Sequence, residues 1–254
     1  MRAVFNRIFY LLLGWVGVQK LRGDSFLGIL LAHPAVVADA GAHRGEFFAA
    51  LKSEYPIFRA LLIEANPVLA GSLKETFGNE IDVLHAALVG GHNNGPVAFT
   101  RSTNPEASTI FSEWAAAYGI ADRVDVPAVD PSHVTGELGG RVDLVKLDVE
   151  GAEIDVLQSA SAADLANCGQ LTVEFHDNRA PITRRDVERV CERLRCEGYA
   201  VVNANWPYVD DVLFVNLKTM PVFRRMAFRC RVALANVLFI VRRVILDRLF
   251  AKGP

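Results

Sequence analysis

The chain has 254 residues, about half of them apolar, and a net charge of −2. This length and composition are those of an ordinary folded protein and predict one sizeable domain with a full core. The four cysteines, Cys168, Cys191, Cys196 and Cys230, form no CxxC pair or paired framework. Their spacing argues against a thiolate metal site and favours a reducing, cytoplasmic compartment.

The chain begins with an apolar run of eleven residues, Ile8 to Val18. A membrane-spanning helix needs about 20 residues, and no small-x-small cleavage pattern follows the run. We therefore expect a retained helix within an N-terminal arm, residues 1–33, that packs on the core or lies at a membrane. An uncleaved anchor is the alternative.

Strands and helices then alternate at short, regular spacing. The pattern predicts strands over 36–39, 59–63 and 81–89, with helices over 46–54 and 67–77 between them. A glycine-containing turn, 41–45, precedes the first of these helices, and Pro67 stands where a first helical turn tolerates proline. Such an order is typical of a parallel sheet with right-handed crossovers.

The following part of the chain is less regular. Extended segments are expected over 97–100, 124–129, 142–147 and 171–175, and helices over 110–118, 152–159 and 183–197. The polar stretch 102–109 is expected to be a loop that could line a pocket. Strands over 199–203 and 212–217 are expected to pair antiparallel, which completes one domain over residues 34–218.

The C-terminal arm, residues 219–254, differs in charge from the rest of the chain. Nine basic residues and one acidic residue lie between Lys218 and Lys252, so this part carries +8 and the remainder −10. Drawn as a helix, its arginines gather on one side, and Met226, Cys230 and Leu234 lie on the other. This pattern predicts contact with an anionic membrane surface rather than with nucleic acid. The protein would then lie peripherally on the inner face of the membrane. Packing against the domain is the alternative.

Two segments place polar residues at the ends of strands, where open α/β sheets bind ligands. In the first, Asp39, Gly41 and Gly45 follow an apolar strand, and Glu64 ends the next strand. Glycines allow close backbone approach, and an acid at the second strand accepts hydrogen bonds from ribose. Because Asp39 stands where a pyrophosphate-binding loop would carry glycine, it disfavours a nicotinamide cofactor and favours the cationic S-adenosylmethionine.

The second segment, residues 142–153, leads from an apolar strand into Asp148, Glu150, Gly151 and Glu153. Acids in the first turn of a helix can be present only because they stabilise the helix dipole. That explanation does not suit Asp148, which still belongs to the end of the strand. Glu174 and His176 end the next strand and could reach the same crevice. Lys146, inside the strand, is expected to pair with a nearby carboxylate.

These motifs together resemble the FkbM-type methyltransferase family, within the class I S-adenosylmethionine-dependent methyltransferases. The resemblance runs from about Val36 to His176 and includes Ile63-Glu64-Ala65-Asn66-Pro67, His85-Ala86-Ala87-Leu88 and Val173-Glu174-Phe175-His176, in the family's order. Two positions depart from the family pattern. His43 stands where the family usually has asparagine, and Glu64-Ala65 replaces a common Glu-Pro.

The resemblance implies a Rossmann-like α/β fold with a mostly parallel seven-stranded sheet, helices on both faces, an antiparallel edge strand and extra terminal helices. It implies methyl transfer to a hydroxyl of a sugar, a glycolipid or a polyketide-like acceptor, so a small-molecule, glycan or lipid-linked partner. The residues expected to bind S-adenosylmethionine are Asp39, Gly41, Ala42, His43, Gly45, Glu64, Ala65, Asn66, Ala86 and Asp148.

Asp148, Glu174 and His176 are the expected catalytic residues. One of them could remove the hydroxyl proton, since an alkoxide attacks a sulfonium far better than an alcohol. The three could instead bind a divalent cation such as Mg²⁺ that lowers the pKa of the hydroxyl. Both roles stay open at this point. The rival functions are a non-catalytic membrane-associated binding protein that keeps the fold and, less favoured, a nicotinamide-dependent oxidoreductase.

Overall fold

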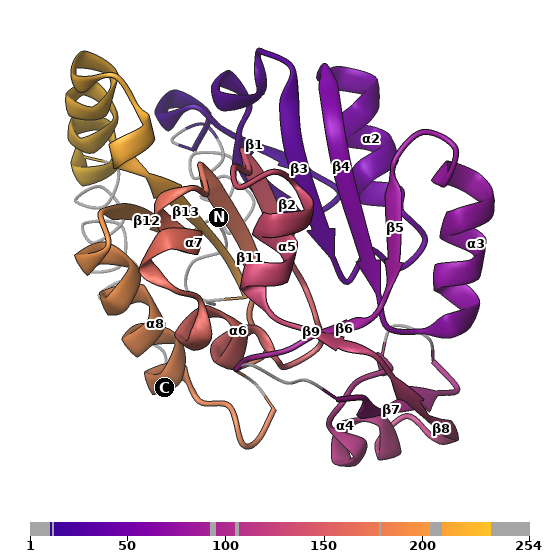
Figure 1. Cartoon of the computed structure of the whole chain (residues 1–254). Helices are drawn as coiled ribbons and strands as arrows, with labels where there is room; N and C mark the ends of the chain where they lie inside the picture. The colour runs from indigo at the N-terminus through magenta and orange to yellow at the C-terminus, as the bar shows by residue number, and fades with distance from the viewer. Residues whose placement is uncertain are drawn as a thin grey trace.

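The computed structural model describes residues 11, 13–91, 95–104, 107–177, 179–203 and 210–234. At its centre is a seven-stranded sheet with the strand order β12-β13-β11-β10-β3-β4-β5 (Figure 1). The predicted class I methyltransferase architecture is confirmed by this order. The strands of the sheet are β3 (Ala35–Ala40), β4 (Ile57–Glu64), β5 (Asp82–His85), β10 (Leu144–Leu147), β11 (Gln170–Glu174), β12 (Tyr199–Asn203) and β13 (Asp211–Asn216).

Within this sheet, β13 is the single antiparallel strand. It pairs antiparallel with both β11 and β12, whereas the other pairs are parallel. The prediction put the antiparallel strand at the edge, but β13 lies one position inside it and β12 forms the edge. Residues 212–215 of β13 are buried without interruption, as expected for a strand covered on both faces.

Helices cover both faces of the sheet, as predicted (Figure 1). On one face, α2 (Glu46–Glu54) and α3 (Pro67–Phe77) pack their Phe48 and Leu73 against β3 and β4. On the other face, α6 (Glu153–Ser159) and α8 (Arg184–Cys196) contribute Val156 and Val190 to the largest core cluster. Two short helices that the sequence did not predict, α5 (Pro131–Glu137) and α7 (Ala162–Ala166), lie on this second face.

A small insertion lies between β5 and β10 and stands apart from the main sheet (Figure 1). It enters and leaves through a parallel pair of two-residue strands, β6 (Ala87–Leu88) and β9 (Ala128–Val129). Between them are an antiparallel pair, β7 (Val97–Ser102) and β8 (Ile120–Val126), and the helix α4 (Ser112–Ala116). The predicted strand over 81–89 is therefore two strands, and the predicted helix over 110–118 is shorter than expected.

The N-terminal arm was predicted as helical, and the structure corrects this prediction. Helix is present at residues 11 and 13–16, but residues 18–27 form a hairpin of β1 (Val18–Leu21) and β2 (Asp24–Leu27), followed by the 3-10 helix η1 (Gly28–Leu31). The turn residues Arg22 and Gly23 have φ values of 56° and 109°, the left-handed pair that a two-residue hairpin requires. The arm is thus continuous with the domain, since β2 packs on β11 and β13. Residues 8–10 and 12 of the predicted apolar run, like residues 1–7 before it, lie outside the described residues.

The C-terminal arm begins after the 3-10 helix η3 (Leu217–Thr219), and residues 222–234 are helical. Phe228 is buried in a cluster with Leu13 and Val16, so the two arms pack on each other. Arg231 Nη1 also donates to the carbonyl oxygen of Trp15, 3.4 Å away. Within the described residues, no helix is both long and apolar enough to cross a membrane. Residues 235–254, with the remaining predicted arginines, lie outside the described part of the chain.

Candidate functional site

A cavity of about 550 Å³ lies at the carboxyl ends of the central parallel strands. This is the edge at which ligands bind in open α/β sheets. Of the residues predicted to bind the cofactor, Gly41, Ala42, His43, Glu64, Ala65, Ala86 and Asp148 line it, as does the predicted catalytic residue Glu174. Asp39, Gly45, Asn66 and His176 do not line it.

The turn after β3 follows the backbone of β10 closely. A Cβ atom on Gly41 would lie 1.6 Å from the carbonyl oxygen of Asp148, and the φ of Gly41 is 78°. Both facts make glycine necessary at this position. His43 has a φ of 49°, a region in which asparagine is common, which explains why the family pattern allows asparagine there. Gly45 (φ 74°) begins α2, where a Cβ atom would meet the side chains of Phe77 and Leu73.

Glu64 fixes this turn to the start of α3. Its Oε2 atom accepts from the backbone N–H of His43 and its Oε1 atom from that of Asn66, both at 2.8 Å. The residue is 7% exposed, and burial raises the pKa of its carboxyl. Each carboxylate oxygen keeps a second lone pair, so Glu64 can also accept from a ligand hydroxyl. Asn66 caps α3 by accepting from the N–H of Val68, a helix-forming role.

Lys146 joins the two acids that end β3 and β10. Its Nζ atom lies 3.0 Å from Asp148 Oδ2 and 3.8 Å from Asp39 Oδ1. The predicted ion pair of Lys146 is confirmed. Asp39 is completely buried, and burial raises its pKa to about 6. Burial lowers the pKa of Lys146, but the charges of Asp148 and Asp39 outweigh it and raise the pKa above its usual value. Asp39 therefore lies behind the cavity wall, where it supports Lys146.

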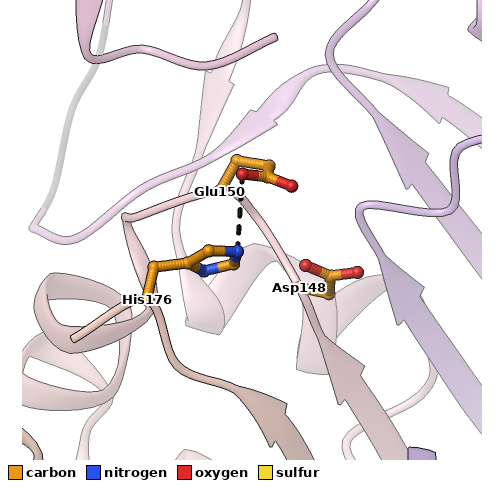
Figure 2. Close-up of side chains that lie close together, drawn as sticks. All are labelled: Asp148, Glu150 and His176. Carbon is orange, nitrogen blue, oxygen red and sulfur yellow. Dashed lines mark ion pairs between the residues drawn. The ribbon is translucent and has the colours of Figure 1, made fainter. Parts of the chain in front are cut away.

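Asp148, Glu150 and His176 form a cluster at the ends of β10 and β11, drawn in Figure 2. One potential ligand atom from each lies within 4.8 Å of those from the others. His176 Nε2 is 3.4 Å from Glu150 Oε2, and its Nδ1 atom is 3.2 Å from Glu153 Oε1. Burial raises the pKa of Glu150 to about 7. Burial lowers the pKa of His176, but the bond to Glu153 and the charges of Glu153 and Glu150 raise it to about 9.

The turn that carries Glu150 is held from behind. Glu153 is completely buried and accepts from the N–H of Val149 at 3.0 Å and of Gly151 at 3.1 Å. Thr109 Oγ1 donates to the carbonyl oxygen of Glu150 at 2.6 Å. The φ of Glu150 is 52°, a left-handed value that a residue other than glycine adopts only when its surroundings enforce it. Glu153 is thus a structural support, beyond the helix-dipole role that the sequence allowed.

Arg179 bounds the cluster on its outer side. Its guanidinium lies over the rings of Trp114 and Tyr118, 5.4 and 5.5 Å from their centroids, and its Nη1 atom is 3.1 Å from Glu150 Oε2. From the predicted polar loop, Ser108 lines the cavity next to Phe99 and Ile110. The insertion therefore supplies part of the cavity wall through Phe99, Ser108 and Ile110.

Sequence reasoning missed three residues of this site. Glu150 was seen in the carboxylate group but not assigned, and its left-handed backbone is the feature that turns its side chain towards His176. Arg22 and Asp24 line the cavity from the β1–β2 hairpin, inside the arm predicted to be helical. The sequence Leu21-Arg22-Gly23-Asp24 between two short extended runs was the available signal for a hairpin turn.

Comparison with known proteins agrees with this geometry. The family model described as "Methyltransferase FkbM domain" matches residues 39–201, more than half of the chain. The AMB antimetabolite synthetase AmbE of Pseudomonas aeruginosa is 27% identical over 211 residues, which cover 68% of this chain and 10% of that protein. The chain therefore spans about a tenth of the length of this curated relative.

Several solved methyltransferases are similar in structure. The SAM-bound amino pentose methyltransferase of Micromonospora echinaspora, involved in calicheamicin biosynthesis, is 11% identical with a TM-score of 0.41, over 74% of this chain and 86% of that chain. An rRNA methylase of Streptococcus thermophilus is 8% identical with a TM-score of 0.42, over 74% and 90% of the two chains.

Proposed function

Since the chain belongs to the FkbM methyltransferase domain family, we propose that it transfers a methyl group from S-adenosylmethionine to a hydroxyl oxygen. We propose a sugar, a glycolipid or a polyketide-like molecule as the acceptor. The observation that carries this proposal is the Asp148, Glu150 and His176 cluster, whose two acids line a cavity large enough for a small-molecule cofactor. Carboxylates and an imidazole at that place suit the removal of a hydroxyl proton.

The residues around the cavity fit S-adenosylmethionine. Glu64 offers lone pairs to the ribose hydroxyls, and Ala65, Ala86 and Leu88 give an apolar wall for the adenine. When bound, the cofactor supplies an electrophilic methyl group on a sulfonium, and Asp148 gives that cation an acidic neighbourhood. Together these residues provide for a cationic nucleoside without phosphates, which disfavours a nicotinamide dinucleotide.

Proton removal from the acceptor falls to the cluster. A general base works best when its pKa lies near the working pH, and Glu150, with a pKa of about 7, meets that condition. His176, with a pKa of about 9, is protonated at neutral pH and holds the Glu150 carboxylate in place. We therefore add Glu150 to the three predicted catalytic residues and propose that it accepts the hydroxyl proton. Asp148 and Glu174 line the same cavity.

A divalent cation is the second way to activate the hydroxyl. Asp148, Glu150 and His176 offer two carboxylates and one imidazole, a ligand set suited to Mg²⁺ or Mn²⁺. Glu153 bound to the other ring nitrogen of His176 is the kind of outer carboxylate that orients metal-binding histidines. Turnover that requires added Mg²⁺ and stops with chelator would identify this route, and turnover unchanged by chelator would identify the general base.

The decisive experiment incubates the purified protein with methyl-labelled S-adenosylmethionine and with sugar, glycolipid and polyketide extracts. Transfer of the label to an acceptor supports the proposal if the labelled methyl group is released by reagents that cleave methyl ethers. Calorimetry with S-adenosylmethionine and with NAD separates the rivals. Binding of the first without transfer to any hydroxyl would indicate a non-catalytic binding protein. Tight binding of NAD alone would indicate an oxidoreductase and overturn the proposal.

We further propose that the arms bring the protein to an anionic membrane surface. The side of the C-terminal helix that faces away from the domain carries Phe223 (71% exposed), Met226 (63%) and Leu234 (48%). Met226 and Leu234 belong to the apolar side expected from the sequence, and Phe228 is the residue that anchors the helix on the domain. Exposed arginines at 224, 229 and 231 stand beside it and match a lipid surface of opposite charge.

A further inference from the structure

The carboxylate of Asp24 stands in the cavity wall, where Lys146 attracts it but no described residue forms an ion pair with it. Asp24 is the first residue of β2, lines the same cavity as Gly41 and Glu64, and is 8% exposed. Among the residues that the structure describes, its side chain has no hydrogen bond or ion pair. A buried carboxylate that lacks a partner is costly, so its position calls for a cation that the folded chain does not itself supply.

The charged groups around Asp24 come from three strands. Lys146 and Asp148 lie on or after β10, Asp39 lies on β3 and Asp211 on β13. Lys146 is already engaged, since it pairs with Asp148 at 3.0 Å and with Asp39 at 3.8 Å. Asp211 is engaged by Lys20 at 2.7 Å. Burial, and to a smaller extent the charges of the three acids, raises the pKa of Asp24 to about 8 against the attraction of Lys146.

The hairpin holds Asp24 in a fixed position. Leu21 pairs with Asp24 across the turn, and the left-handed Arg22 and Gly23 close it. The next residue, Ser25, is completely buried and donates from Oγ to Asp211 Oδ2 at 2.7 Å. The backbone N–H of Leu27 donates to Gln170 Oε1 at 2.8 Å. Asp24 is therefore attached to β11 and β13 and not to a mobile arm.

Two cationic side chains line the same cavity as Asp24. They are Arg22, on the hairpin turn, which pairs with Glu46, and Arg44, in the turn after β3. A cavity lined by both an acid and guanidiniums is complementary to an amino-acid group, whose ammonium needs an acid and whose carboxylate needs a base. S-adenosylmethionine carries such a group at its methionine end.

We infer that Asp24 binds the α-ammonium group of S-adenosylmethionine, so that the β1–β2 hairpin is part of the cofactor site. This inference rests on the proposed function. It assigns the sulfonium to the Asp148 side of the cavity, where the acceptor is expected, and the amino-acid end to the hairpin. The chain segment before the first strand of the sheet is then required for cofactor affinity, although it lies outside the region that the family model matches.

The test compares three ligands by calorimetry on the full chain. S-adenosylmethionine has the ammonium and the sulfonium, S-adenosylhomocysteine has only the ammonium, and 5′-methylthioadenosine has neither. Asp24→Asn should raise the Kd of the first two ligands by about 10- to 100-fold, the range for a charged hydrogen bond. The Kd of the third should stay within about twofold of the wild-type value. Glu54→Gln, an exposed acid on α2, is the matched control and should bind all three as the wild type does.

A second readout follows protons. Asp24 has a pKa of about 8 and is mainly protonated at pH 7. Binding of an ammonium to its carboxylate must therefore release the Asp24 proton to the solvent. Calorimetry in buffers of different ionisation enthalpy should show this release in the wild type and its loss in Asp24→Asn.

Each outcome decides the matter. If Asp24→Asn binds both adenosyl ligands as tightly as the wild type, the inference is wrong. If it weakens only S-adenosylmethionine, the carboxylate faces the sulfonium and the assignment to the ammonium is wrong. If the wild type binds none of the three ligands, the proposed function fails first and this inference falls with it.

Discussion

His176 and Glu153 are joined by a contact between the Nδ1 atom of the imidazole and the Oε1 atom of a completely buried carboxylate, 3.2 Å apart. The same carboxylate accepts from two backbone N–H groups of the turn that carries Glu150. A single side chain thus fixes both the ring and the turn of the candidate catalytic cluster.

Replacement of Glu153 should therefore affect stability and the titration of His176 together. Glu153→Ala leaves the Nδ1 atom of the imidazolium and the N–H groups of Val149 and Gly151 without their acceptor, which should lower the free energy of unfolding by about 3 kcal/mol. Glu153→Gln keeps an acceptor for the turn but removes the charge, so the pKa of His176 should fall from about 9 towards its usual value. Chemical denaturation and NMR titration of the imidazole measure the two effects. An unchanged His176 pKa in Glu153→Gln would contradict this account.

Gly41 should tolerate no side chain. In Gly41→Ala the new Cβ atom would lie 1.6 Å from the carbonyl oxygen of Asp148, and alanine would have to adopt a φ of 78°. We expect the free energy of unfolding to fall by more than about 3 kcal/mol, or the variant to fail to fold. Gly91 has a similar φ of 79° but nothing within 4 Å of its Cβ position, and Gly91→Ala should cost only about 1 kcal/mol of backbone strain. Equal unfolding midpoints for the two variants would show that the approach of the first turn to β10 is less close than described.

Asp24→Asn should stabilise the protein in the absence of cofactor. The pKa of Asp24 rises from 3.8 to about 8 on folding, so the folded state binds the proton more tightly. Its contribution to stability is therefore full below pH 4 and is lost as the pH rises through about 8. The variant, which has no charge to bury, should gain on the wild type between pH 5 and 8 by on the order of 4 kcal/mol. Thermal unfolding across this pH range tests the sign, and a variant that is less stable at pH 8 would refute it.

Turnover should depend on the charged groups of the Asp148, Glu150 and His176 cluster. Glu150→Gln and Asp148→Asn keep the shape of their side chains, and each should lower kcat by about 10²- to 10⁴-fold with the fold retained. Asp155→Asn, an exposed acid in the first turn of α6, is the matched control and should retain wild-type turnover. His176→Ala should also lose turnover. Wild-type rates in Asp148→Asn, Glu150→Gln and His176→Ala together would remove the cluster from the reaction.

Membrane association should require the outward side of the C-terminal helix. Removal of the whole arm is a poor test, because Phe228 belongs to a core cluster with Leu13 and Val16. Phe223→Ser with Met226→Ser alters exposed side chains only and should reduce sedimentation with anionic vesicles at low salt. Vesicles of zwitterionic lipid provide the control. If the unaltered chain does not sediment with anionic vesicles, the docking proposal is wrong.

The main sheet could be predicted because each of its strands carries a local signal. Strand β3 reads as an apolar run that ends in an acid and a glycine turn, and β10 reads as an apolar run before a group of carboxylates. The apolar run of β13 was expected to pair antiparallel with residues 199–203, as it does. Its place one position inside the edge could not be read, because strand order depends on pairing between distant segments.

The site was predicted in part for a similar reason. Residues in sequence motifs, such as Gly41, Glu64 and Asp148, were found because their chemistry and their place at strand ends agree. Asp24 was missed because an apolar run at the N-terminus favoured a helix and concealed a four-residue strand. Glu150 was left unassigned because its direction depends on a left-handed φ that only Gly151, Thr109 and the buried Glu153 together enforce.

The parallel pair β6–β9 brings the two ends of the insertion together, since the chain leaves and re-enters the domain on adjacent strands. The insertion is also tied to the domain at its far end, because Thr109 donates to the carbonyl oxygen of Glu150 and Trp114 Nε1 donates to that of Ala180. Since the same segment supplies Phe99, Ser108 and Ile110 to the cavity, we expect that exchange of residues 90–127 would change the cavity wall and the turn of Glu150 together.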